Sequence, residues 1–121
     1  MLPLMRIRIP VDEARAKQEA GEVTVIDQLT TNQDLRATKK ISGSIRIPAD
    51  ELPDRLDELP RDRGVVTYCT CPHDELSART ALFLRKQGYD AWALEGGLDD
   101  WIEAHYPTED RESEVVEENR D

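Results

Sequence analysis

The chain has few cysteines and no long hydrophobic run. Its 121 residues include only two cysteines, Cys69 and Cys71. Because these are separated by a single residue, they cannot cross-link distant parts of the chain, and their reactivity matters more than any effect on stability. No run of about 18 or more apolar residues is present, and the opening segment MLPLMRIRIP mixes arginine and proline into the region where a signal peptide is continuously apolar. We therefore expect a soluble, cytoplasmic protein that does not associate with membranes.

Acidic residues outnumber basic ones, and glycine is scarce. The formal net charge is -10, and none of the 6 glycines belongs to a phosphate-binding loop of the nucleotide-binding type. Because nucleic-acid binding needs a clustered positive surface, the composition argues against nucleic acid as a partner. Residues 107–121 are strongly acidic and hold few apolar side chains, so we expect a disordered C-terminal tail. Residues 1–106 suffice for a single domain.

Short β-prone runs alternate with helix-like segments along residues 1–106. Alternating apolar positions and β-branched residues predict strands at residues 5–9, 23–27, 44–48, 65–69 and 91–95. Helical spacing and capping signals, including Asp12 as an N-cap, predict helices at residues 12–18, 52–59, 77–87 and 96–104, with a short helical turn at residues 32–36. This alternation favours an α/β fold in three layers, in which helices flank a mainly parallel five-stranded sheet. The run at residues 65–69 is the expected central strand.

Cys69 ends this expected central strand, at the edge of the sheet where parallel sheets bind their ligands. A helix is expected to begin a few residues later, near Ser77. The free N–H groups and the dipole of a helix N-terminus favour the thiolate, which is the nucleophilic form of cysteine. These features predict a reactive Cys69. The alternative is that Cys69 is a small buried residue that ends a core strand, as free cysteines often are.

Four segments resemble the rhodanese-like domain family and follow one another in that family's order. YCTCPHDELSAR is similar to the family's active-site loop and following helix, and LEGGLDDW to its closing motif. Upstream, KISGSIRIP and VID resemble a characteristic loop-to-strand stretch and a strand that ends in aspartate. The resemblance spans residues 5–104 and implies a rhodanese-like fold. It also implies a sulfurtransferase that moves sulfane sulfur from thiosulfate or a persulfide, through a cysteine persulfide, to a thiol, a cyanide-like acceptor or a protein.

The resemblance leaves two cysteines as candidates for the nucleophile. Cys69 matches the family's cysteine when the comparison is anchored on the strand, and we favour it because a loop absorbs extra residues more readily than a strand does. Cys71 matches when the comparison is anchored on the serine that follows the loop, Ser77. Asp27 is expected to support the loop by hydrogen bonds to its backbone. The remaining residues of the expected loop and helix start are Thr70, Pro72, His73, Asp74, Glu75, Leu76 and Arg79.

The loop departs from the family pattern, which keeps a second function open. It lacks the usual glycine and arginine, Pro72 has no N–H to donate, and Asp74 and Glu75 place negative charge where the family binds an anion. The alternative is therefore a catalytically weak or inactive rhodanese module that binds a partner or senses redox or persulfide state through its two cysteines. His73 together with those cysteines supplies too few ligands for zinc, so neither a metal nor another cofactor is expected.

Overall fold

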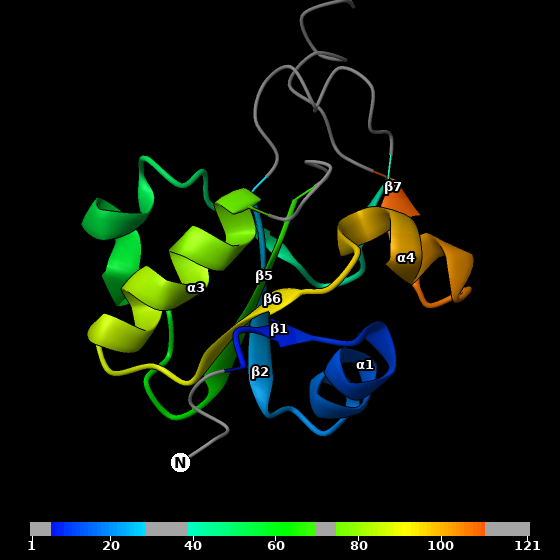
Figure 1. Cartoon of the computed structure of the whole chain (residues 1–121), viewed down its shortest axis with the longest axis horizontal. Helices are drawn as coiled ribbons and strands as arrows, with labels where there is room; N and C mark the ends of the chain where they lie inside the picture. Colours follow the sequence, from blue (N-terminus) through cyan, green and yellow to red (C-terminus); the bar gives the residue numbers. More distant parts are fainter. Residues whose placement is uncertain (1–5, 29–38, 70–74, 111–121) are drawn as a thin grey trace, which may run out of the picture.

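A five-stranded parallel sheet forms the centre of the molecule (Figure 1). The computed structural model describes residues 6–28, 39–69 and 75–110. The strands are β1 (Arg8–Ile9), β2 (Val23–Asp27), β4 (Ile45–Arg46), β5 (Gly64–Tyr68) and β6 (Ala91–Leu94), and they lie in the order β1-β6-β5-β2-β4. Every pairing within this sheet is parallel. The structure thus confirms the predicted α/β fold, with β5 as the central strand.

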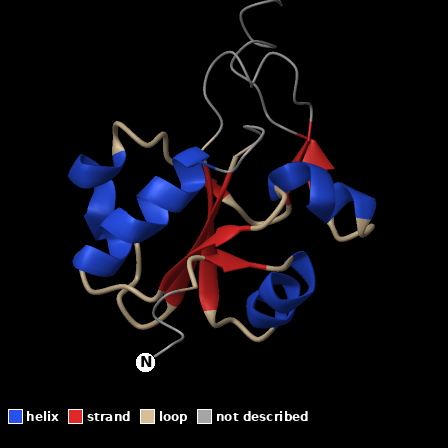
Figure 2. Cartoon of the chain, in the orientation of Figure 1, coloured by secondary structure: helices blue, strands red, loops and turns tan. Residues whose placement is uncertain are grey.

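Helices cover both faces of the sheet (Figure 2). On one face, α1 (Val11–Glu19) and α4 (Gly97–Glu103) pack over a core cluster that includes Val25, Tyr68 and Trp101. On the other face, η2 (Leu52–Glu58) and α3 (Glu75–Lys86) pack over a cluster that includes Ile26 and Leu84. Successive strand residues point to opposite faces, so strands that are buried on both faces are apolar nearly throughout. Among the described helices, none is long and apolar enough to cross a membrane.

Two helices differ from their predicted form. α1 begins at Val11, and Asp12 is not its N-cap, because the carboxylate of Asp12 accepts a hydrogen bond from the Tyr106 hydroxyl instead. The predicted helix at residues 52–59 is the 3-10 helix η2, and its backbone is non-helical at Arg55. The leucine spacing still serves the core, since Leu52 is buried within the cluster under α3. Residues three apart lie on the same side in both kinds of helix, so a three-residue spacing does not separate the two.

A second, two-stranded sheet was not predicted. β3 (Lys39–Ile41) pairs antiparallel with β7 (Thr108–Asp110). The pairing is reinforced by an ion pair between Lys39 Nζ and Asp110 Oδ1 at 2.6 Å, and it is anchored by the fully buried Ile41. Residues 108–110 lie in the segment predicted to be a disordered tail, and the structure instead places them in a strand. Residues 111–121 and the predicted helical turn at residues 32–36 lie outside the described residues.

Candidate active site around Cys69

Cys69 directly follows the central strand, at the carboxyl end of the sheet, and its side chain is fully buried. Its backbone is held from two sides. The Leu98 N–H, at the start of α4, donates to the Cys69 carbonyl at 3.4 Å, and the Gln28 N–H donates to the carbonyl of Tyr68 at 2.9 Å. The sheet and α4 together therefore fix the direction in which the chain leaves β5.

The first turn of α3 lies against Cys69. Ser77 is also fully buried, and its Oγ is 3.9 Å from Cys69 Sγ. Thr67 precedes Cys69 on the same face of β5, and its hydroxyl donates to the Ser77 carbonyl at 2.9 Å. These contacts hold the sulfur near the N-terminus of a helix of 12 residues, where free N–H groups and the helix dipole favour negative charge. The position suits a thiolate or a persulfide anion.

Cys69 is disulfide-bonded in this structure and is not a free thiol. The other cysteine of the chain, Cys71, lies outside the described residues. The choice between the two as nucleophile therefore stays a prediction. A nucleophilic role for Cys69 requires that its disulfide first be reduced. The predicted loop residues Thr70, Pro72, His73 and Asp74 also lie outside the described part of the chain.

The remaining predicted site residues lie on α3 and β2. Glu75 is the first residue of α3, Leu76 is half-buried, and Arg79 is exposed. Arg79 therefore does not share the buried environment of Ser77. Asp27 is fully buried at the end of β2, and its carbonyl accepts a hydrogen bond from the Ile47 N–H at 3.0 Å. Its predicted hydrogen bonds to the loop stay a prediction.

Two further residues organise this end of the sheet and were missed by sequence reasoning. The fully buried Tyr68 hydroxyl accepts a hydrogen bond from the Ile41 N–H at 3.1 Å and lies 3.0 Å from Ser44 Oγ, which joins β5 to β3. Gln28 is buried directly after β2, and its Nε2 donates to the Ile47 carbonyl at 3.2 Å. The sequence did offer a signal for both residues, because each carries a polar group at the carboxyl end of a buried strand, where parallel sheets bind their ligands.

A hollow of about 460 Å³ lies at the opposite end of the sheet, where β2 and β5 begin. Two of the cations that line it already lie over aromatic rings. Lys17 Nζ is 5.1 Å from the centre of the Trp92 ring, and the Arg61 guanidinium is 4.4 Å from the centre of the Tyr89 ring. This hollow is remote from Cys69, so we place the candidate chemistry at the carboxyl end of the sheet.

The chain is similar in sequence to a known domain family and to two known proteins. The rhodanese-like domain profile matches residues 10–104. The chain is 34% identical over 98 residues to the HTH-type transcriptional regulator Rv0324 of Mycobacterium tuberculosis, which covers 81% of this chain and 42% of that protein. It is 32% identical over 68 residues to a sulfurtransferase of Allochromatium vinosum, which covers 55% of this chain and 62% of that protein. The chain thus spans less than two thirds of the length of either relative.

A solved structure has a fold similar to that of this chain. A rhodanese-related protein from Thermoplasma volcanium superposes with a TM-score of 0.70 at 28% identity, over 85% of this chain and 97% of that chain. One of the two relatives above is named a sulfurtransferase. The family profile matches most of the chain, and the chain therefore belongs to the rhodanese-like domain family.

Proposed function

We propose that the chain is a sulfurtransferase that carries sulfane sulfur as a persulfide on Cys69. The observation that supports this best is the position of Cys69 Sγ, which is fully buried at the end of the central strand and 3.9 Å from Ser77 Oγ in the first turn of α3. Negative charge at this point is stabilised by the helix N-terminus. Membership of the rhodanese-like family and the similarity to a protein named a sulfurtransferase add support.

The proposed reaction consists of two displacements at sulfur. After reduction, the Cys69 thiolate attacks the outer sulfur of a donor such as thiosulfate. A new S–S bond forms as the donor's S–S bond breaks, and sulfite leaves with the electron pair. A nucleophilic acceptor, either a thiol, which a protein can supply, or cyanide, then attacks the outer sulfur of the persulfide, and Cys69 leaves as a thiolate. Both displacements balance without an external oxidant or reductant, whereas the preceding reduction of the Cys69 disulfide takes two electrons from a thiol reductant.

The fold contributes rigidity to these steps. The Leu98 N–H fixes the Cys69 carbonyl, and the Thr67 hydroxyl fixes the first turn of α3 through the Ser77 carbonyl. The sulfur is therefore held in one place relative to the helix N-terminus before the donor arrives. Such preorganisation lowers the cost of holding negative charge on the Cys69 thiolate before the attack and of returning it there when the acceptor cleaves the persulfide.

The experiment that tests this proposal is intact-mass analysis of the reduced protein after incubation with a sulfur donor. The native chain, Cys69→Ser and Cys71→Ser are each treated with thiosulfate and, separately, with the hydropersulfide of cysteine. We expect a reducible gain of one sulfur atom that is lost in Cys69→Ser and kept in Cys71→Ser. Loss only in Cys71→Ser would instead assign the persulfide to Cys71. No gain from either donor, in a folded and reduced native chain, would refute the proposal.

A second candidate function is sensing of redox or persulfide state. Two observations favour it: the relative with 34% identity is named a transcriptional regulator, and Cys69 is disulfide-bonded in the structure. A sensing module needs a reversible change at Cys69 but no turnover. Repeated transfer of sulfur to added cyanide, measured as thiocyanate over many cycles per protein molecule, supports the enzyme. A single round of sulfur loading or disulfide formation without turnover supports the sensor.

A further inference from the structure

The outward side of α3 carries two cations around an exposed leucine. Arg79, Leu82 and Lys86, the basic stripe, are three and four residues apart, so they lie along one side of the helix. Leu82 is 51% exposed and is the most exposed of the large apolar side chains that the structure describes. Neither Arg79 nor Lys86 forms an ion pair with a described residue. The stripe is therefore open to a partner that offers carboxylates around an apolar contact.

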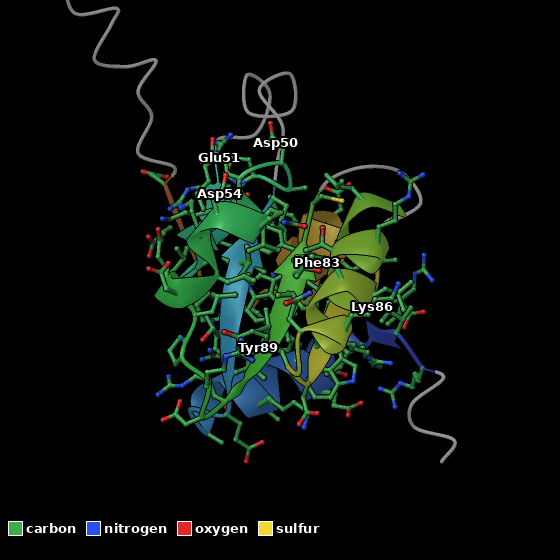
Figure 3. The ribbon with its side chains drawn as sticks, turned by 90° about the vertical axis from the view of Figure 1, so that its left-hand side faces the viewer. Asp50, Glu51, Asp54, Phe83, Lys86 and Tyr89 are labelled. Atoms are coloured by element: carbon green, nitrogen blue, oxygen red, sulfur yellow. The ribbon has the colours of Figure 1, made fainter. Side chains whose placement is uncertain are left out.

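η2 lies beside α3 on the same face of the sheet and presents the opposite charge (Figure 3). Asp50, Asp54 and Asp57, the acidic edge, are exposed, and none of them forms an ion pair with a described residue. The two glutamates of this segment differ from these aspartates, because both are ion-paired with Arg55. One face of the molecule thus holds an open acidic half and an open basic half.

The two halves of this face are held in a fixed relation. η2 and α3 pack on the same core cluster, and the Tyr89 hydroxyl, just after α3, donates to the Leu59 carbonyl, just after η2, at 2.9 Å. Leu56 of η2 and Phe83 of α3 are half-buried and pack against that cluster, so apolar surface also reaches the outside of this face. A partner can therefore dock here without a rearrangement of the two helices.

We propose that two copies of the chain associate through this face as a twofold-symmetric dimer. A twofold axis that lies in the plane of contact and runs along the line between η2 and α3 turns the basic stripe of each copy onto the acidic edge of the other. A partner with charge of one sign matches only half of the face, whereas a second copy matches both halves. Because the contact is small and its charges stay partly in water, the dimer is weak and dissociates readily.

The test is sedimentation velocity of the full chain at concentrations up to about 1 mM, which detects weak association. A thiol reductant is present throughout, so that no disulfide links two copies. One variant combines Arg79→Glu with Lys86→Glu and makes both halves of the face acidic. A second variant combines Asp54→Lys with Asp57→Lys and replaces most of the acidic edge by cations. All four side chains are exposed, so both variants should keep the fold.

The matched control combines Asp99→Lys with Glu103→Lys. Both residues are exposed on α4, which covers the opposite face of the sheet from α3. This control has the same net charge as the second variant but leaves the proposed contact unchanged. It therefore separates a local charge match from a general effect of charge on association.

We expect the native chain and the control to dimerise alike, and each of the two variants alone to dimerise at least about tenfold more weakly, because every ion pair lost on one side of the twofold axis is lost on the other as well. An equimolar mixture of the two variants should form a heterodimer, since each acidic half then meets a basic half. The first variant mixed with the control should not associate.

A native chain that stays monomeric up to the highest concentration overturns the inference. So does a dimer that both variants keep undiminished, or a mixture of the two variants that fails to associate. A readout that needs no variant is the change of backbone NMR shifts of the native chain with concentration. Changes at exposed residues of α3 and η2 support the proposed face, and changes confined to other elements overturn it.

Discussion

We expect removal of the Tyr68 hydroxyl to destabilise the fold, because this hydroxyl links β5 to β3. It accepts the Ile41 N–H at 3.1 Å and lies 3.0 Å from Ser44 Oγ, and all three residues are buried. Tyr68→Phe keeps the ring in the core but leaves a buried N–H without its partner. Such a loss costs about 1–3 kcal/mol. With a urea m-value of about 2 kcal/mol/M for a small domain, a loss of about 2 kcal/mol lowers the unfolding midpoint by about 1 M.

The assay is urea unfolding under reducing conditions, so that the disulfide of Cys69 does not contribute. Tyr106→Phe serves as the control, because the hydroxyl that it removes bonds Asp12 at the surface. Amide exchange at Ile41, followed by NMR, gives an independent readout, and the protection of this N–H should fall in Tyr68→Phe alone. If Tyr68→Phe shifts the midpoint no further than Tyr106→Phe does, the hydroxyl is not the tie between β5 and β3.

Three further predictions follow from the packing and the charges. A Cβ at Gly64 would meet the Asp90 carbonyl oxygen at 2.8 Å, so Gly64→Ala should cost about 1–3 kcal/mol in urea unfolding, and a negligible shift would contradict the contact. Hydrogen bonds from Arg55 lower the pKa of Glu58, so this pair stabilises the fold above the ordinary carboxyl pKa and loses its effect as the pH falls through the lowered value. NMR titration should show the Glu58 pKa rising in Arg55→Gln, and an unchanged pKa would refute the pairing. A chain truncated before β7 should unfold at lower urea than one truncated after it, whereas equal midpoints would show that β7 adds no stability.

Sulfur transfer and sensing share their first chemical step on this fold. In both proposals, Cys69 reacts as a thiolate at the N-terminus of α3, and the two proposed functions differ only in the steps that follow. An enzyme must release the sulfur to an acceptor and return to the thiolate, whereas a sensor must keep the modified state long enough to change a contact. The similarity to a protein named a regulator and to one named a sulfurtransferase is consistent with a shared first step.

The sequence by itself determined the fold class and the position of Cys69 directly after the central strand. The runs VTVID and VVTYC are rich in β-branched residues, and they form the paired strands β2 and β5 as predicted, although β5 begins and ends one residue earlier, at Gly64 and Tyr68. Helical spacing likewise located the helix that begins beside Cys69. These features were readable because strand and helix patterns depend on neighbours close in sequence. The 3-10 form of η2 was not predicted, because the spacing of Leu52, Leu56 and Leu59 is typical of an α-helix and contacts beyond the segment decided its backbone.

Only the tertiary structure decided which residues surround Cys69. Nothing local to Gln28 indicates that it lies opposite Cys69, because the register of β2 on β5 depends on the packing of the whole sheet. The pairing of β3 with β7 joins segments from the two halves of the chain, and the acidic character of β7 made it look like part of a tail. Contacts between residues far apart in sequence depend on packing and on which charges meet, so local patterns do not reveal them.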